Sequence, residues 1–138
     1  MDTIQLCTFY INEHLFGIEV DRVQEVIKQH QITPLPLSPT FVGGLINLRG
    51  QIVMAIDLKD KMNLAKTLEN SAQMNIILRH TDSLISLLVD SVGDVISVSP
   101  EKIELELPHL PPEISKLIMG ICKTEQNLLM ILDPEQLI

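Results

Sequence analysis

The stretch VDRVQEVI, from Val20 to Ile27, returns in altered form as VDSVGDVI, from Val89 to Ile96. The two stretches share Val, Asp, Val, an acidic residue, Val and Ile at the same positions. Self-similarity of this kind indicates a duplicated structural unit. We therefore expect two related halves.

A second pair of blocks follows the first pair in the same order. The spacing from Gly44 to Asp57 is the same as the spacing from Gly120 to Asp133. The second pair of blocks lies further apart along the chain than the first pair, which predicts an insertion in the second half near 104–112. One short match can arise by chance in a β-rich protein, but two blocks in one order favour duplication.

Most of the chain has the pattern of short strands, with apolar and β-branched residues between turn signals. Strands are expected over 4–10, 14–20, 45–48, 51–56, 75–79, 84–89, 92–98, 117–123 and 128–132. Arg49 and Gly50 mark a hairpin turn, and Asp21 is an expected N-cap for a short helix that ends near Ile27. Further short helical turns are expected near Asp60 and over 134–138.

About five short strands in each half are most stable as a small closed barrel, because closure removes exposed edges. The predicted fold is mainly β, with two pseudo-repeated five-stranded barrels and short helices. One domain over 1–138 would contain a first barrel with short helices at 1–63, a linker at 64–73 and a second barrel at 74–138.

Composition narrows the classes of partner. The 138 residues carry a net charge of -8 with only 3% aromatic side chains, which disfavours nucleic acid and anionic membrane surfaces as partners. No run approaches the length of a membrane span, and Met1–Asn12 does not have the form of a signal peptide. We expect a cytoplasmic chain with no direct membrane insertion, in which Cys7 and Cys122 are buried and reduced.

Catalytic and cofactor motifs are missing from the sequence. The two glycines at 43–44 do not have the spacing or the lysine of a phosphate loop, and the four histidines are scattered without metal-ligand spacing. The pairs Asp21 with Asp90 and Asp57 with Asp133 do not sit in the loops of a carboxylate dyad and are interpreted as turn and cap residues. No enzymatic activity, cofactor or metal is expected.

Arg49 is the exception among the charged residues. It occupies a strand-to-strand turn in a region poor in positive charge, with Glu25 as an available partner. A solvated arginine of this kind contributes little to stability, about 0–1 kcal/mol. The alternative is a guanidinium positioned for a binding partner.

The segments FGIEVDRVQEVI at 16–27 and GGLINLRGQIVMAIDL at 43–58 resemble the CheW family of bacterial chemotaxis coupling proteins. The resemblance continues in order through LLVDSVGDVISV at 87–98 and MGICKTEQNLLMILDPEQL at 119–137. It implies two barrels of the Src-homology type around a shared apolar core. It also implies a non-catalytic adaptor, monomeric when free, that is recruited to membrane-associated receptor arrays.

The resemblance further implies that the chain bridges the cytoplasmic helical tip of chemoreceptors and the regulatory domain of a CheA-type histidine kinase. The receptor tip would lie in a groove between the barrels, and the kinase would dock barrel to barrel. Carried onto matching positions, the receptor-binding residues are Val23, Glu25, Gly44 and Arg49. The kinase-binding residues are expected in the second barrel, at Met74, Ser86 and Val92.

Two alternatives stay open from the sequence. The chain could be a small-ligand or peptide-binding β-barrel unrelated to chemosensing. Within chemosensing, flagellar and pilus-type pathways use similar couplers, and the sequence does not decide between them. Broken symmetry in the repeat favours a receptor contact from the first half, because Asp94 and Glu125, of like charge, stand where the first half has Glu25 and Arg49.

Overall fold

The computed structural model describes residues 2–28, 30–65, 74–105, 110–125 and 127–137. Within these ranges the chain forms mainly β-strands. The strands are β1 (Ile4–Ile11), β2 (His14–Glu19), β3 (Val23–Lys28), β4 (Val42–Leu48), β5 (Gln51–Asp57), β6 (Met74–His80), β7 (Ser83–Val89), β8 (Ser91–Val98), β9 (Ile118–Lys123) and β10 (Leu128–Leu132). The helices are η1 (Val20–Arg22), α1 (Leu58–Lys61), η2 (Pro100–Lys102), α2 (Pro112–Ser115) and η3 (Pro134–Gln136).

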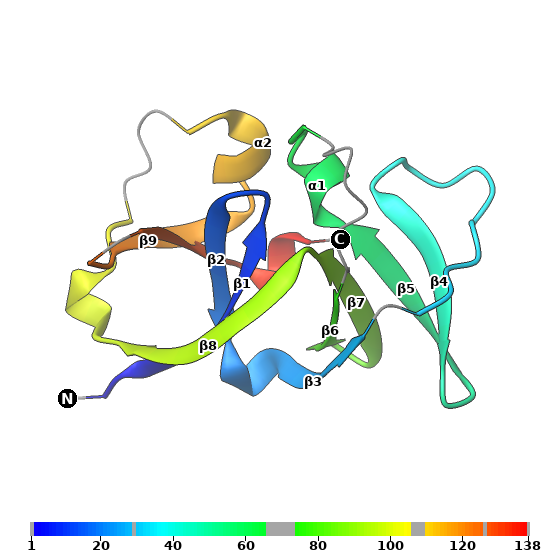
Figure 1. Cartoon of the computed structure of the whole chain (residues 1–138), viewed down its shortest axis with the longest axis horizontal. Coiled ribbons are helices and arrows are strands. Elements are labelled where there is room, and N and C mark those ends of the chain that lie inside the picture. The colour runs from blue at the N-terminus through cyan, green and yellow to red at the C-terminus, as the bar shows by residue number, and fades with distance from the viewer. Residues whose placement is uncertain (1, 29, 66–73, 106–109, 126, 138) are drawn as a thin grey trace.

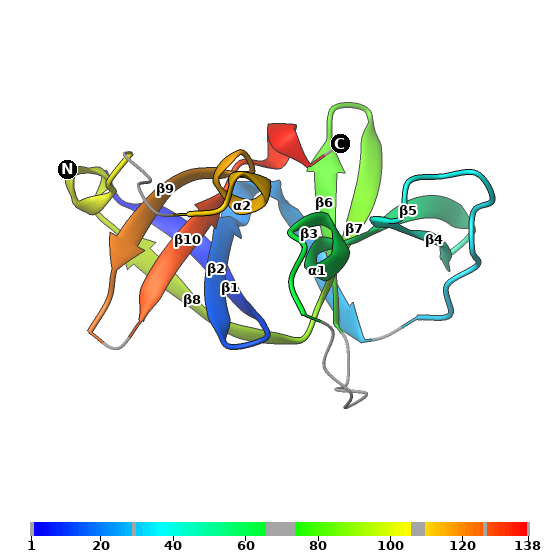
Figure 2. The same ribbon diagram turned by 90° about the horizontal axis from the view of Figure 1, so that it is seen from above.

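The strands form two five-stranded sheets, which we name sheet A and sheet B. Sheet A has the order β8-β1-β2-β10-β9, and sheet B has the order β3-β6-β7-β5-β4. In Figures 1 and 2, sheet A lies on the left and sheet B on the right. The expectation of a mainly β protein with two related five-stranded units is confirmed.

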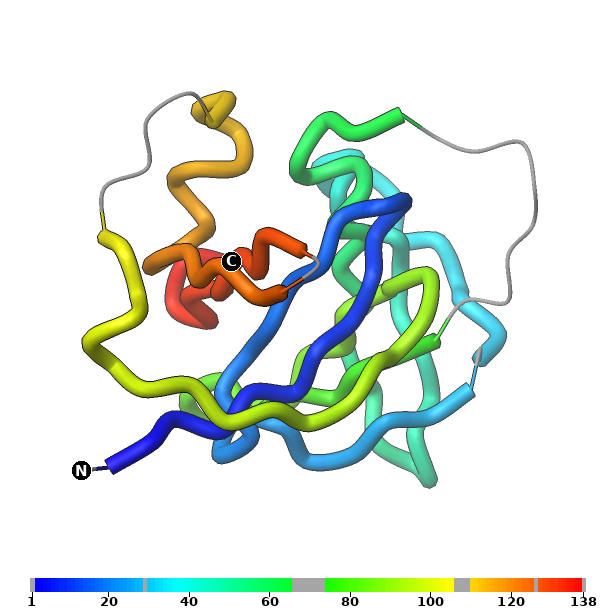
Figure 3. Tube along the Cα trace, turned by 60° about the vertical axis from the view of Figure 1, so that its left-hand side comes forward, coloured from blue at the N-terminus to red at the C-terminus, as the bar shows by residue number. Residues whose placement is uncertain are grey.

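The two halves of the chain are interleaved between the sheets. Sheet A combines the hairpin β1–β2 with β8, β9 and β10, and sheet B combines the hairpin β6–β7 with β3, β4 and β5. Figure 3 shows the trace of β8 returning beside β1, with which it pairs in antiparallel register. The expected division into barrels at 1–63 and 74–138 is therefore wrong. Because the two halves are related, each hairpin could pair with the later strands of either half. The local sequence pattern does not determine which of the two pairings forms.

Each sheet curls but does not close into a complete barrel. Thr33, beyond β3, exchanges two main-chain hydrogen bonds of 2.8 Å with Leu45 of β4. Glu104, beyond β8, makes the equivalent pair with Ile121 of β9, at 2.8 and 2.9 Å. These isolated bridges bring the end strands together at corresponding places in the two sheets.

The apolar core has three parts. The largest cluster takes side chains from both sheets, including Phe9 and Phe16, whose rings stack with centroids 5.8 Å apart. A smaller cluster fills the inside of each curled sheet. The cluster in sheet A lies around Leu6 and Leu129, and the cluster in sheet B lies around Ile77. Because burial of apolar area is the main favourable term in folding, the shared cluster holds the two sheets together as one body.

The short helices were predicted with partial success. Helix α1 and helix η3 lie where helical turns were expected, near Asp60 and after Asp133. The helix expected between Asp21 and Ile27 is wrong, since only η1 is helical and Val23–Lys28 is a strand paired with β6. Its β-branched residues and its regular alternation of half-buried and exposed positions favour a strand. The predicted linker, 64–73, lies outside the described residues from 66 onward.

Cys7 and Cys122 are both buried free thiols, as expected. Among the residues that the structure describes, none of the helices has the length and hydrophobicity needed to span a bilayer.

Candidate functional site

All four receptor-binding candidates lie in sheet B. Val23 and Glu25 are on β3, Gly44 is on β4, and Arg49 is in the turn between β4 and β5. Strands β3 and β4 are the two ends of sheet B in the strand order, and the bridge from Thr33 to Leu45 brings them together. The curl of the sheet therefore gathers residues that are well separated in the sequence.

Arg49 and Glu25 form an ion pair across this closure. Nη2 of Arg49 donates to Oε1 of Glu25 at 2.6 Å. The Arg49 side chain is 66% exposed and the Glu25 side chain 29% exposed, so the guanidinium faces solvent while its partner is held by the strand. The pairing expected from the sequence is confirmed, although Glu25 reaches it from a strand and not from a helix.

The turn that carries Arg49 has a defined geometry. Arg49 and Gly50 have φ values of 51° and 88°, and positive φ at both central residues is typical of the tight hairpin turn that matches strand twist. The side-chain oxygen Oδ1 of Asn47 accepts the N–H of Gly50 at 2.8 Å and fixes the turn. The base of the Arg49 side chain is therefore rigid.

Val23 lies where the chain crosses from sheet A to sheet B. It follows η1 directly, pairs with Leu78 of β6 and packs half-buried against the shared core. Its position next to the seam between the sheets is compatible with the groove that the resemblance implies. Only part of the side chain is available to a partner.

Gly44 is buried. It has a φ of 143°, and a Cβ at this position would overlap the carbonyl of Thr33. The backbone that approaches Gly44 closely is therefore the chain's own, and the role carried over for this residue as a receptor contact needs correction. Gly44 positions the closure that brings Glu25 and Arg49 together.

The three kinase-binding candidates do not form one surface in a second barrel. Met74 and Ser86 are in sheet B and Val92 is in sheet A. Ser86 is 0% exposed inside the curl of sheet B, so a direct contact between Ser86 and a partner is excluded. Met74 and Val92 are half-buried and lie on either side of one crossing, because Met74 pairs with Val89 and Val92 follows shortly after it on β8.

The aspartates of the repeat have structural roles. Asp57 accepts the N–H of Asp60 and caps α1, and Asp133 accepts the N–H of Glu135 and caps η3. Asp90 pairs with Lys59, and Asp21 lies inside η1 without capping it. In the described ranges, no three His, Cys, Asp or Glu side chains gather as a metal site requires.

Sequence reasoning missed one further feature, an apolar pocket at one end of sheet A. A residue-by-residue comparison of the two repeats holds the signal that points to it, because Glu19 in the first repeat stands where the second has Leu88.

Two interleaved five-stranded sheets around a shared core, with a solvent-facing ion pair where the end strands of sheet B meet, define the class of the fold, a small β protein of two sheets. A protein-family model described as the CheW-like domain matches residues 5–138 of the chain. The chain therefore belongs to this family of chemotaxis coupling proteins. Members of the family are non-catalytic adaptors. The alternative of a barrel unrelated to chemosensing is set aside by this membership.

The relatives and a solved structure agree with the family. The chain is 30% identical to the chemotaxis protein CheW of Treponema pallidum, covering 99% of this chain and 82% of that protein. It is 31% identical to CheW of Thermotoga maritima, covering 97% and 87%. The crystal structure of the scaffolding protein TtCheW from Thermoanaerobacter tengcongensis superposes with a TM-score of 0.86 at 31% identity, covering 96% of this chain and 90% of that one.

A relative of lower identity carries a different name. The protein PilI of Pseudomonas aeruginosa is 25% identical over 86% of this chain and 66% of that protein. The chain is thus a chemotaxis coupling and scaffold protein with relatives of both names.

Proposed function

We propose that this protein bridges the helical tip of chemoreceptors and the regulatory domain of a CheA-type histidine kinase, in the cytoplasm, as a monomer without catalytic activity of its own. Family membership supports the coupling role. The arrangement around Arg49 supports the receptor side, because it presents a fixed cation at the surface where sheet B closes.

The single observation that carries the receptor side is the ion pair between Arg49 and Glu25. A surface ion pair with one partner 66% exposed contributes little to stability, about 0–1 kcal/mol. The stability of the fold therefore does not account for an arginine that is held in a rigid turn with its guanidinium oriented. A guanidinium held in this way offers several N–H donors to the carboxylates and carbonyls of a docked helix.

The receptor-binding residues that we propose are Arg49, Glu25 and Val23, with Gly44 in a positioning role. Val23 would supply an apolar anchor for a helix laid along the seam between the sheets. On the kinase side we propose Met74 and Val92, which flank the crossing from β7 to β8 and retain exposed surface. Ser86 is not included, because it is fully buried.

The receptor role of Arg49 is tested in a reconstituted array of receptor fragment, kinase and this protein. Arg49→Ala is expected to fold normally and to weaken receptor-dependent control of the kinase by about tenfold, the loss typical of one charged anchor. Lys102→Ala removes an exposed cation on η2 of sheet A and serves as the matched control. Equal control by both variants would sink the role of Arg49.

A charge exchange separates a receptor contact from a purely structural ion pair. The double variant Glu25→Arg with Arg49→Glu retains a pair of opposite charges at the same two positions. If the pair only holds sheet B together, the exchange restores kinase control. We expect no restoration, because the receptor would then meet a carboxylate where it needs a guanidinium.

A further inference from the structure

Two polar side chains lie inside the curl of sheet B. Asn75 on β6 and Ser86 on β7 are both 0% exposed. Ile77 and Leu88, two positions further along the same two strands, belong to the smaller apolar cluster of sheet B. Because alternate residues of a strand share one face, Asn75 and Ser86 point into that cluster.

Neither polar side chain has a hydrogen-bond partner among the residues that the structure describes. Both polar atoms of the Asn75 amide, Oδ1 and Nδ2, and the hydroxyl oxygen Oγ of Ser86 are buried and unpaired. The residues opposite them in register on the neighbouring strands are all apolar: Ile27, Leu88, Ile77 and Ala55. Burying a polar group without a hydrogen bond destabilises a fold, so three such atoms in one place call for a partner.

Asn75 and Ser86 are diagonal neighbours on the inner face of two adjacent strands. Sheet A shows how close such neighbours come, because Leu6 and Gly17 occupy the corresponding places in the repeat. A Cβ added to Gly17 would lie 3.4 Å from the Cβ of Leu6. The side chains of Asn75 and Ser86 therefore lie side by side, within reach of one small bridging molecule.

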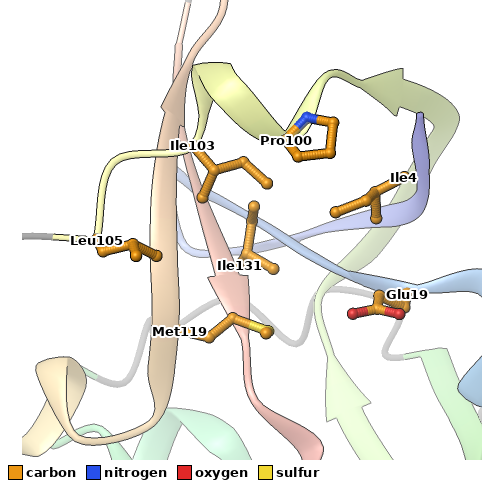
Figure 4. A pocket seen from close by; sticks show the side chains of 7 residues that line it. All are labelled: Ile4, Glu19, Pro100, Ile103, Leu105, Met119 and Ile131. Atoms are coloured by element: carbon orange, nitrogen blue, oxygen red, sulfur yellow. The ribbon is translucent and has the colours of Figure 1, made fainter. Parts of the chain in front are cut away.

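Sheet A fills the corresponding place without polar side-chain atoms. Leu6 is 0% exposed and lies over Gly17. Ile131, labelled near the centre of Figure 4, is the residue of β10 that pairs with Gly17. In sheet B the residue of β5 that pairs with Ser86 is Ala55, whose side chain is a single methyl group. Sheet B thus has polar atoms and a smaller neighbour where sheet A is filled by hydrocarbon.

We propose that sheet B holds one internal water molecule that bridges the amide of Asn75 and the hydroxyl of Ser86. A water molecule both donates and accepts hydrogen bonds, so it serves an amide and a hydroxyl at the same time, and buried waters in proteins occupy places of this kind. The site suits water and not an ion, because neither side chain is charged and the residues opposite them are apolar.

The water links β6 to β7 from inside the curl, on the face opposite the shared core. It also gives Ser86 a role that needs no contact with a partner protein, in agreement with its complete burial. The inference concerns the interior of sheet B, so it is independent of the proposed receptor and kinase contacts.

The first test is a crystal structure of the full native chain at a resolution that shows ordered waters. We expect a density peak inside sheet B within about 2.7–3.2 Å of both the Asn75 amide and Oγ of Ser86. A direct hydrogen bond between the two side chains, with no peak between them, would show that the proposal is wrong.

The second test transfers the apolar pair of sheet A into sheet B. The double variant Asn75→Leu with Ser86→Gly is expected to hold one long-lived internal water fewer than the native chain, counted in solution by magnetic relaxation dispersion of the water oxygen. Asn127→Leu with Ser97→Gly makes the same two changes at exposed positions and should keep the native count. An unchanged count in the first double variant, or an equal loss in both, would overturn the proposal. If the first double variant does not fold, the crystal structure of the native chain decides.

Discussion

The carboxylate of Asp90 lies 2.8 Å from the ammonium nitrogen of Lys59, and its other oxygen accepts the main-chain N–H of Asn12 at 2.6 Å. Asp90 is on the crossing from β7 to β8, Lys59 is in α1 beyond sheet B, and Asn12 is in the β1–β2 turn of sheet A. The two side chains of the ion pair are only 13% and 15% exposed. One carboxylate thus joins both sheets at the place where the chain passes between them.

The repeat builds a second joint at the other crossing with the charges reversed. Arg22, on the crossing from β2 to β3, lies 2.9 Å from Glu135 of η3. In the first joint the residue on the crossing is the acid, Asp90, and in the second joint it is the base, Arg22. The second joint is also more open, since its side chains are 29% and 55% exposed.

The two joints should differ in their contribution to stability. Lys59→Ala leaves a mostly buried carboxylate without its cation and is expected to lower the free energy of unfolding by about 2–3 kcal/mol. Arg22→Ala removes a solvent-screened pair and should cost about 1 kcal/mol or less. Urea denaturation of both variants measures the difference. Equal losses would contradict the assignment of Asp90 as the dominant joint.

The closure of sheet B should be intolerant of a side chain at Gly44. Gly44→Ala places a Cβ against the Thr33 carbonyl at a φ that alanine rarely adopts, and we expect a loss of about 2–4 kcal/mol in unfolding free energy. Gly43→Ala is the control, because the close neighbour of its new Cβ would be the flexible end of Leu88, with the Ala55 carbonyl oxygen at ordinary contact distance, and it should cost about 1 kcal/mol or less. Thermal unfolding distinguishes the two. A Gly44→Ala protein as stable as Gly43→Ala would refute the close approach.

The thiols should be protected in the folded state. Burial raises the pKa of the Cys7 thiol, and Cys122 is only 4% exposed. Because the thiolate is the reactive form and needs access to the reagent, labelling by a disulfide reagent should be slower than that of free cysteine by about two orders of magnitude or more. Both thiols should react after denaturation in urea. Rapid labelling of either thiol in the native protein would show that its strand opens easily.

The pKa of Lys61 is lowered by burial and by the neighbouring ammonium of Lys116. Its ammonium nitrogen also lies 3.7 Å from the centroid of the Phe41 ring, so the side chain reaches from the end of α1 to the residue before β4. Between the lowered pKa and the ordinary value, the folded protein binds fewer protons than the unfolded chain. This group therefore makes the protein more stable as pH rises through that window.

Removing the ammonium of Lys116 should move the pKa of Lys61 back toward its ordinary range. Lys116→Glu is expected to raise the pKa of Lys61, measured from the carbon signal next to its amino group during an alkaline NMR titration. Lys102→Glu makes the same charge change on η2 and should leave that pKa where it is. A pKa that responds equally to both changes would show a long-range field and not a local contact.

Much of the fold followed from local patterns in the sequence. The described strands other than β3, the turn at Arg49 and Gly50, the caps at Asp57 and Asp133 and the duplication were predicted from residue types and spacing and are present, whereas β3 was expected to be a short helix. These features depend on neighbours within a few positions along the chain. The pairing of Glu25 with Arg49 could also be predicted from the sequence, because Arg49 has few acidic partners available in a region poor in charge.

The features that escaped prediction depend on which strands meet. Nothing in the local pattern of β1 and β2 says that they pair with β8 and β10, and the error at 1–63 and 74–138 follows from that. The burial of Ser86 escaped for the same reason, since a serine in a strand is buried or exposed according to how the sheet curls. The sequence predicted that a backbone approaches Gly44 closely, but it assigned that backbone to a receptor, whereas the structure shows that it is the chain's own at Thr33.

The exchange of hairpins between the sheets limits how such a protein could have arisen. A half-length chain with this topology would have a hairpin and three further strands that do not belong to the same sheet. Two copies that exchanged hairpins would build both sheets, so a half-length ancestor of this design would have existed as an intertwined pair. Joining two such copies end to end would let the two sheets diverge, and Glu19 and Leu88 now stand at corresponding positions in them.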